Sequence, residues 1–246
     1  MPQIFDNIAE DSQLVTALQQ TVRVSQRADF CVGYLNLRGW RAIADDIDAW
    51  AGEDGTDGAA ARCRVLVGMQ GRPEDELRSH LTQYGEPPLL DNATAIRLRK
   101  QLALTFREQL TLGAPTNRDE AALRQLARQL RSGKVAVKLY LRHRLHAKLY
   151  LFHRQDAFAP VIGYLGSSNL TFAGLAGQGE LNVDVIEQDA ARKLARWFEE
   201  RWHDRFCLDI TTELAEIIEE SWARTALIPP YQIYVKMAYH LSQEAR

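Results

Sequence analysis

Two short stretches and one acidic residue combine side chains that suit chemistry on a phosphodiester. His146 and Lys148 are two residues apart, so on a strand they project from the same face and place an imidazole beside a fixed cation. Residues 166–169 read Gly-Ser-Ser-Asn, and such a turn supplies a hydroxyl, an amide and backbone N–H groups. Glu180 follows shortly afterwards. A nucleophilic imidazole, a cation and several hydrogen-bond donors form a set that can attack phosphorus and stabilise the charge that develops.

Each residue has a definite role in that chemistry. His146 would attack phosphorus in line and form a phosphohistidine intermediate. Lys148 would hold one non-bridging phosphate oxygen, and Asn169 would donate its amide to another. Ser167 and the backbone N–H groups of the turn would add to the binding of the phosphate. Glu180 would accept a hydrogen bond from the second ring nitrogen of His146 and so fix its tautomer.

Each residue also has a structural interpretation when it is taken alone. His146 would be a satisfied strand histidine, Lys148 a lysine facing water, and Glu180 a charge at the start of a strand. The Gly-Ser-Ser-Asn turn would simply begin a helix. The presence of all four features in one stretch favours the catalytic interpretation.

A metal site is the rival interpretation of the histidines. His143, His146 and His153 are separated by three and seven residues, which does not bring three imidazoles to one face of a strand. The first carboxylate that follows them is Asp156. We therefore predict no metal and no cofactor.

The pattern resembles the signature of the phospholipase D superfamily, His-x-Lys-x-x-x-x-Asp followed by Gly-Ser-x-Asn. Two departures are present: His153 stands at the Asp position, and residues 154–160 lengthen the gap before the turn. The nuclease branch of the superfamily often lacks that Asp and carries a Glu soon after the Asn, as Glu180 does here. The resemblance therefore implies a nuclease rather than a lipase. The matching positions are His146, Lys148, Gly166, Ser167 and Asn169.

The resemblance also implies partners. The chain holds one His-x-Lys motif, and single-motif members pair two identical subunits, so we expect a homodimer with one composite site and His146 of the second copy as general acid. The rest of the chain resembles the domain that precedes a helicase motor in larger bacterial proteins, although no Gly-x-x-x-x-Gly-Lys-Ser/Thr motif is present. The expected function is metal-independent DNA cleavage in phage defence or restriction, with a helicase in the same polypeptide or complex.

The elements that must position these residues alternate between strands and helices. Six apolar runs predict strands at 28–37, 62–69, 135–141, 145–152, 161–165 and 181–186. Helices are predicted at 11–26, 40–50, 74–84, 93–112, 119–131, 190–206, 211–226 and 231–242. This order indicates an α/β fold, with a mixed central sheet flanked by helices. The phospholipase D-like sandwich has the same architecture.

The strand at 145–152 orients the key pair. Leu145, Ala147, Leu149 and Leu151 alternate, and we expect them to face the core. His146 and Lys148 would then lie on the opposite face. The aromatic residues Trp197, Phe198, Trp202 and Trp222 recur at helical spacing and are predicted to be core residues.

Composition narrows the class of protein. The chain has 246 residues, is 46% hydrophobic and 25% charged, and is ordinary for a globular protein. Its three cysteines are far apart without metal-ligand spacing, which indicates free thiols and a cytoplasmic location. Neither a signal peptide nor an apolar run of membrane-spanning length is evident. We predict a nuclease domain at 1–227 and a C-terminal helix at 228–246 that leads towards a helicase region.

Charge distribution favours a polyanion as substrate. Residues 121–154 carry nine basic side chains and no Asp or Glu, and this block leads directly into the His-x-Lys pair. A solvated basic surface is the alternative explanation. Two other functions stay open: a catalytically silent DNA-binding and dimerisation module, and a phosphodiesterase that acts on a lipid or a small molecule. The absence of an amphipathic membrane-binding helix argues against the lipid.

Overall fold

A computed structural model describes residues 2–50, 62–68, 92–110 and 117–220. Its centre is an eight-stranded sheet with the order β1-β7-β6-β5-β2-β3-β4-β8. Strand β2 runs parallel to β3, and β3 parallel to β4, while the other neighbours are antiparallel. The mixed sheet agrees with the α/β prediction. The strands are β1 (Ile4–Phe5), β2 (Arg27–Val32), β3 (Cys63–Val67), β4 (Val135–Tyr140), β5 (Leu149–His153), β6 (Val161–Gly166), β7 (Asn182–Val185) and β8 (Cys207–Asp209).

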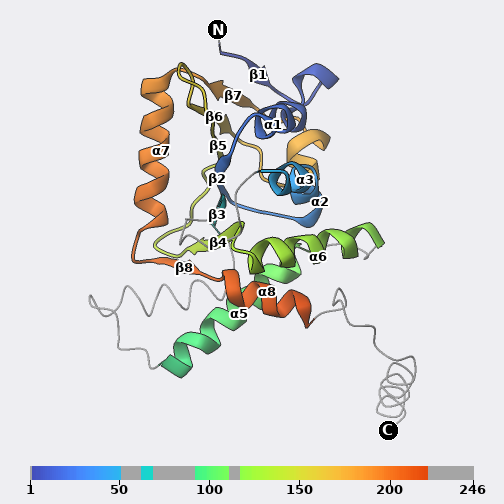
Figure 1. The fold of residues 1–246 in the computed structure, drawn as a ribbon, viewed down its shortest axis with the longest axis vertical. Helices are drawn as coiled ribbons and strands as arrows, with labels where there is room; N and C mark the ends of the chain where they lie inside the picture. The colour runs from blue at the N-terminus through green and yellow to red at the C-terminus, as the bar shows by residue number, and fades with distance from the viewer. Residues whose placement is uncertain (1, 51–61, 69–91, 111–116, 221–246) are drawn as a thin grey trace.

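Helices cover both faces of this sheet (Figure 1). Helix α7 (Gln188–Trp202) lies on one face, and the other described α-helices lie on the opposite side or below it. These are α1 (Leu14–Arg23), α2 (Leu37–Arg41), α3 (Ala44–Asp48), α5 (Asn92–Leu110), α6 (Asn117–Arg131) and α8 (Thr211–Glu219). Two short turns of helix complete the described elements, η1 (Glu10–Ser12) and η2 (Ala173–Gly177).

The sheet separates two apolar cores. The larger contains alternate residues of the central strands, such as Phe30, Tyr150 and Phe152, whose rings meet edge to face at centroid distances of 5.3 and 5.5 Å. The smaller lies under α7 and contains Leu149, Leu151 and other residues of the central strands. Each fully buried Leu or Phe contributes about 1.5–3 kcal/mol to folding. The alternation that fills both cores fixes the strand register and hence which side chains face outward.

The six predicted strands are confirmed, with two shifts that matter for the site. The strand predicted at 28–37 ends at Val32, because Leu37 already begins α2. Strand β5 begins at Leu149 instead of Leu145, so residues 145–148 lie outside the sheet. Strands β1 and β8 were not predicted, because two and three residues are too few to show a period.

The helix predictions agree with the structure in most places. The predicted helix at 40–50 is wrong in extent: it is two short helices, and the first starts earlier because the Asn36 side chain accepts a hydrogen bond from Gly39 N–H at 2.8 Å. The predicted helices at 74–84 and 231–242, and the end of the one at 211–226, lie outside the described residues. Within the described ranges no helix has the length and apolar character to cross a membrane.

Candidate active site

The segment before β5 presents the predicted nucleophile and cation. Leu145, Leu149 and Leu151 are buried in the core under α7, with Ala147 packed against it, as their alternation predicts. His146 is exposed and Lys148 is half-buried. Lys148 Nζ donates to the His146 carbonyl at 2.7 Å, so the ammonium folds back beside the histidine's own peptide. The Lys148 ammonium therefore lies beside the backbone of His146, just before β5 begins.

The turn after β6 brings Asn169 to the same place. Asn169 Oδ1 accepts a hydrogen bond from Tyr34 N–H at 2.9 Å, which ties the turn to the end of β2. A methyl group placed on Gly33 would lie 3.1 Å from Asn169 Oδ1 and 3.8 Å from Lys148 Nζ. Because both atoms are within 4 Å of one point, the cation and the amide converge at the end of β2. An anion beside Lys148 would bind the Asn169 amide through its NH₂ group, because Oδ1 is an acceptor and is held by Tyr34 N–H.

Ser167 and Glu180 are paired with each other at the Gly-Ser-Ser-Asn turn. The Ser167 hydroxyl donates to the Glu180 carboxylate and accepts from Leu181 N–H at 3.0 Å. Glu180 is therefore held beside the Gly-Ser-Ser-Asn turn, although it lies thirteen residues from Ser167 in sequence. The predicted role of Glu180 towards the His146 ring stays a proposal.

The other two histidines of the rival metal site lie in other surroundings. His143 is exposed, and its ring meets Tyr140 edge to face at a centroid distance of 5.4 Å. His153 Nε2 lies 2.7 Å from Asp29 Oδ2 at the opposite end of β5 from His146. Within the described part of the chain no three or more His, Cys, Asp or Glu side chains are grouped as a metal site.

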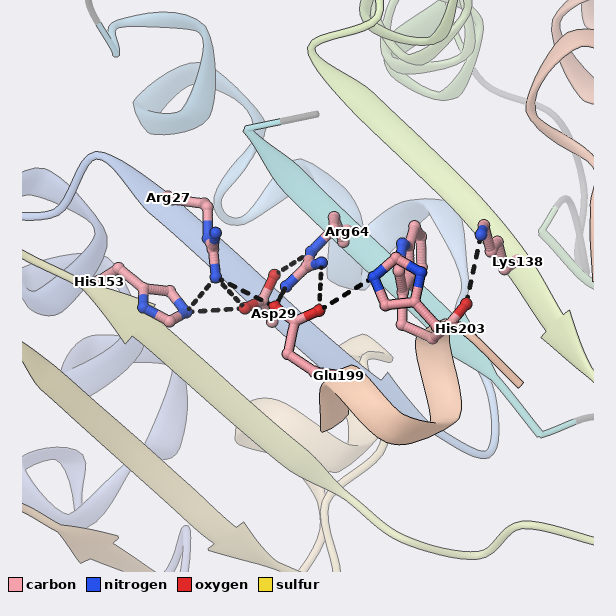
Figure 2. Close-up of polar contacts among 8 residues, drawn as sticks. Arg27, Asp29, Arg64, Lys138, His153, Glu199 and His203 are labelled. Carbon is pink, nitrogen blue, oxygen red and sulfur yellow. Dashed lines mark hydrogen bonds and ion pairs between the residues drawn. The ribbon is translucent and has the colours of Figure 1, made fainter. Parts of the chain in front are cut away.

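His153, at the position of the motif aspartate, belongs to a charged network under α7 (Figure 2). Asp29, 1% exposed, accepts from Arg64 Nε at 2.6 Å and from Arg27 Nη2 at 3.0 Å, besides its contact with His153. Glu199 of α7 accepts two hydrogen bonds from Arg64, at 2.5 and 3.0 Å. The family motif has an Asp at the position of His153 on β5. In this chain the carboxylate beside that position is Asp29, which belongs to β2.

That network holds the pKa of its acids down. Burial alone raises the pKa of Asp29, but hydrogen bonds from His153 and Arg64 and the charge of Arg64 outweigh it and keep the pKa well below its ordinary value. The hydrogen bonds from Arg64 are the main reason that the pKa of Glu199 is also lowered. Both acids are therefore ionised at neutral pH and fasten α7 to the sheet.

The basic block of residues 121–154 is partly neutralised by acids from elsewhere. Seven of its nine basic side chains bind carboxylates or carbonyls: Arg124 to Glu120, Arg131 to Glu219, Arg142 to Asp204, Arg154 to Asp156, Lys134 to the Asp48 carbonyl, Lys138 to the Trp202 carbonyl and Lys148 to the His146 carbonyl. Arg144 and Lys148 are the members that flank His146. The predicted polyanion surface is therefore narrower than the sequence indicates.

The sequence matches the pattern of a known family. The pattern of the family described as "Cardiolipin synthase, PLD-like domain" matches residues 63–202, which is more than half of the chain. The chain belongs to the phospholipase D superfamily. The matched region contains His146, Lys148 and the Gly-Ser-Ser-Asn turn. No curated protein matches the sequence.

Several solved structures of this superfamily and of related proteins are similar to the chain. Nuc from Salmonella typhimurium, a phospholipase D family member, has 10% identity and a TM-score of 0.45 over 85% of this chain and 97% of its own. NucT from Helicobacter pylori has 10% identity and a TM-score of 0.43 over 85% and 98%. Phosphatidylserine synthase from Haemophilus influenzae has 14% identity and a TM-score of 0.44 over 89% and 43%.

The residues that hold the Gly-Ser-Ser-Asn turn in place were not predicted from the sequence. Tyr34 contributes through its backbone N–H, which no side-chain pattern reveals. Tyr150 and Asn182 contribute through buried hydrogen bonds to Ser168. The signal available in the sequence was that Tyr150 and Asn182 each place a hydrogen-bonding group inside a predicted strand.

Proposed function

We propose that this chain is a metal-independent phosphodiesterase that cleaves DNA through a phosphohistidine at His146, with Lys148, Asn169, Ser167 and Glu180 in the roles given above. The observation that carries the proposal is the convergence of Lys148 Nζ and Asn169 Oδ1 at Gly33, beside the segment that bears His146. A fixed cation and the NH₂ group of the neighbouring amide can hold the two non-bridging oxygens of a phosphodiester.

The chemistry proceeds in two displacements. In the first, a ring nitrogen of His146 attacks phosphorus, the P–N bond forms, and the bond from phosphorus to the leaving oxygen breaks. A second imidazole gives that oxygen its proton. In the next, the same second imidazole takes a proton from water, the water oxygen attacks phosphorus, and the P–N bond breaks. Lys148 stabilises the negative charge that both transition states place on the phosphate oxygens.

The second imidazole comes from a second copy of the chain in this proposal. His143 and His153 are the histidines nearest in sequence, and neither is grouped with His146 in the contacts described above. Two copies related by a two-fold axis would bring two His146 side chains to one phosphate. The oligomeric state in solution tests this part, because a monomeric active enzyme would contradict it.

DNA is favoured as substrate by the resemblance to the nuclease branch and by Arg144 and Lys148 beside His146. Phosphate contacts of this kind give binding that weakens steeply with salt. A helicase partner and a role in phage defence or restriction belong to the same proposal and rest on the resemblance of the whole chain.

A lipid phosphodiester is the second candidate substrate. Large apolar side chains are exposed close in sequence to the site residues, with Leu165 at 39%, Phe172 at 58% and Leu181 at 64% exposure. Such a rim would accept acyl chains, and it would equally accept a second copy of the chain. Cleavage assays on both substrate classes therefore decide between the candidates.

The test compares wild type with His146→Ala on plasmid DNA, single-stranded DNA and vesicles of anionic phospholipid. His143→Ala is the matched control, because it removes an exposed imidazole three residues away. We expect cleavage of DNA that His146→Ala abolishes and His143→Ala leaves intact. Cleavage of the lipid alone would select the second candidate, and no cleavage of any substrate would favour a silent DNA-binding module.

A further inference from the structure

Ser168 is the fully buried residue between the two proposed phosphate contacts, Ser167 and Asn169. Every polar group of Ser168 is engaged. Its N–H donates to Asn182 Oδ1 at 3.2 Å, and its hydroxyl accepts from Asn182 Nδ2 at 2.8 Å. Its carbonyl accepts from the Tyr150 hydroxyl at 2.8 Å. The buried side chains of Tyr150 and Asn182 therefore hold Ser168, in the middle of the turn, through three hydrogen bonds.

These two side chains stand on strands whose own positions are fixed. Asn182 is 2% exposed and begins β7, in register with Gly166 of β6. Tyr150 is 1% exposed and lies in β5, between β2 and β6. A methyl group on Gly166 would collide with the Leu181 carbonyl and with Asn182 Oδ1, so the close approach of the turn to Asn182 requires glycine there.

Asn169, the last residue of the turn, is oriented by the segment that follows β2. Tyr34 N–H holds Asn169 Oδ1 at 2.9 Å, which turns the NH₂ end of the amide away from that contact. The Asn169 backbone, in turn, follows directly from Ser168. Any shift of Ser168 is therefore transmitted to the amide that would donate to the phosphate.

We propose that Tyr150 and Asn182 are positioning residues that fix the Gly-Ser-Ser-Asn turn in the geometry needed for phosphate binding and phosphoryl transfer. This inference rests on the proposed function. Donors act in a transition state when they are held in place by residues that are themselves locked. Burial keeps the Tyr150 hydroxyl protonated, since it raises the pKa of that group well above its ordinary value, so Tyr150 remains a neutral donor.

The chain contains a matched control for Tyr150. Tyr164 stands directly opposite Tyr150 in the β5–β6 register and is also buried. Its hydroxyl lies 2.6 Å from Thr21 Oγ1, on α1, and does not contact the turn in the described hydrogen bonds. Tyr150→Phe and Tyr164→Phe therefore each remove one buried, hydrogen-bonded hydroxyl from neighbouring strands. Their effects on folding should be similar, and their effects on the site should differ.

The experiment measures kcat and KM for DNA cleavage, the affinity for inorganic phosphate by calorimetry, and Tm for wild type and both variants. We expect Tyr150→Phe to lower kcat roughly 10- to 100-fold, as small misplacements of catalytic groups do, and to weaken phosphate binding. Tyr164→Phe should leave kcat and phosphate affinity unchanged while it lowers Tm to a similar degree. Asn182→Ala should lower kcat in the same way as Tyr150→Phe.

The outcomes separate this inference from the proposed function. An active, phosphate-binding wild type whose kcat and phosphate affinity are unaffected by Tyr150→Phe would overturn the positioning role alone. Equal losses of kcat in Tyr150→Phe and Tyr164→Phe would also overturn it, because the effect would then be one of general stability. A wild type that neither cleaves phosphodiesters nor binds phosphate would overturn the proposed function and this inference with it.

Discussion

Replacing Asp29 with asparagine should be among the most damaging single-atom changes outside the site. Asp29 is 1% exposed and faces three donors, from Arg27, Arg64 and His153, at 2.6 to 3.0 Å. Asn keeps the shape but loses the charge that offsets Arg64, whose side chain is 5% exposed. After the change the buried guanidinium of Arg64 has one negatively charged partner instead of two, because Glu199 is the acid that remains.

The size of this loss follows from burial. Breaking a buried ion pair by removing one partner costs about 3–5 kcal/mol, and the retained carbonyl oxygen of asparagine places Asp29→Asn near the lower value. For a chain of this length each 1 kcal/mol lowers Tm by about 2–4 °C. We therefore expect Tm to fall by roughly 6–12 °C at neutral pH. Helix α7 should loosen first, because Glu199 ties it to this network.

The same network sets a pH dependence. The pKa of Asp29 is lower in the folded chain than in the unfolded chain, whose carboxyl titrates near its ordinary value of about 4. Between those two pKa values the unfolded state binds a proton that the folded state does not, so the free energy of unfolding falls as pH falls below about 4. Above that pH the contribution of Asp29 is fully present. The gap in stability between wild type and Asp29→Asn should therefore shrink in acid.

Urea unfolding followed by tryptophan fluorescence, from pH 3 to pH 7, measures this gap. Asp189→Asn is the control, because that carboxylate is 71% exposed and pairs with Lys193 on the surface of α7. The control should unfold like wild type at every pH. Asp29→Asn with wild-type stability at neutral pH, or a gap that widens in acid, would refute the reasoning.

Three further predictions follow from close packing and burial. Gly33→Ala places a methyl 3.1 Å from Asn169 Oδ1, so turnover should fall severalfold with little change in Tm, and a fully active variant would show that the amide position is not critical. Gly39→Ala places a methyl against the Leu170 backbone, which cannot give way, so Tm should fall by several degrees; an unchanged Tm would contradict this contact. Burial raises the pKa of Cys31 to about 12, so its thiol should resist a disulfide reagent at pH 8 until denaturant is added, and rapid labelling of Cys31 in the native chain would contradict its burial.

The sequence predicted the sheet and the face of the key pair well, because both depend on local alternation. Leu145, Leu149 and Leu151 fill one core, and the intervening residues must then face away from it. The start of β5 was placed too early, because residues 145–148 continue the alternation of apolar and polar side chains although they lie outside the strand. Periodicity reports the backbone shape and does not report which strand pairs with it.

The pairings among charged residues could not be predicted from sequence. Asp29 and Arg64 meet because β2 and β3 are neighbours, and the carboxylate of Asp29 faces His153 from the adjacent β5. The basic block looked unopposed because its acidic partners, such as Glu219 and Asp204, are distant in sequence. Such contacts are set by topology, and they decide how much charge a surface offers to DNA.

The most direct test of the central claim is DNA cleavage in excess EDTA, combined with detection of DNA joined to the enzyme by an acid-labile P–N bond. We predict that cleavage survives EDTA, and that quenched reactions carry a DNA fragment joined through its phosphate to His146, which mass spectrometry would locate and His146→Ala would abolish. Cleavage that EDTA eliminates and added divalent metal restores would contradict it. Cleavage without any phosphorylated His146 would contradict the covalent route even if no metal were needed.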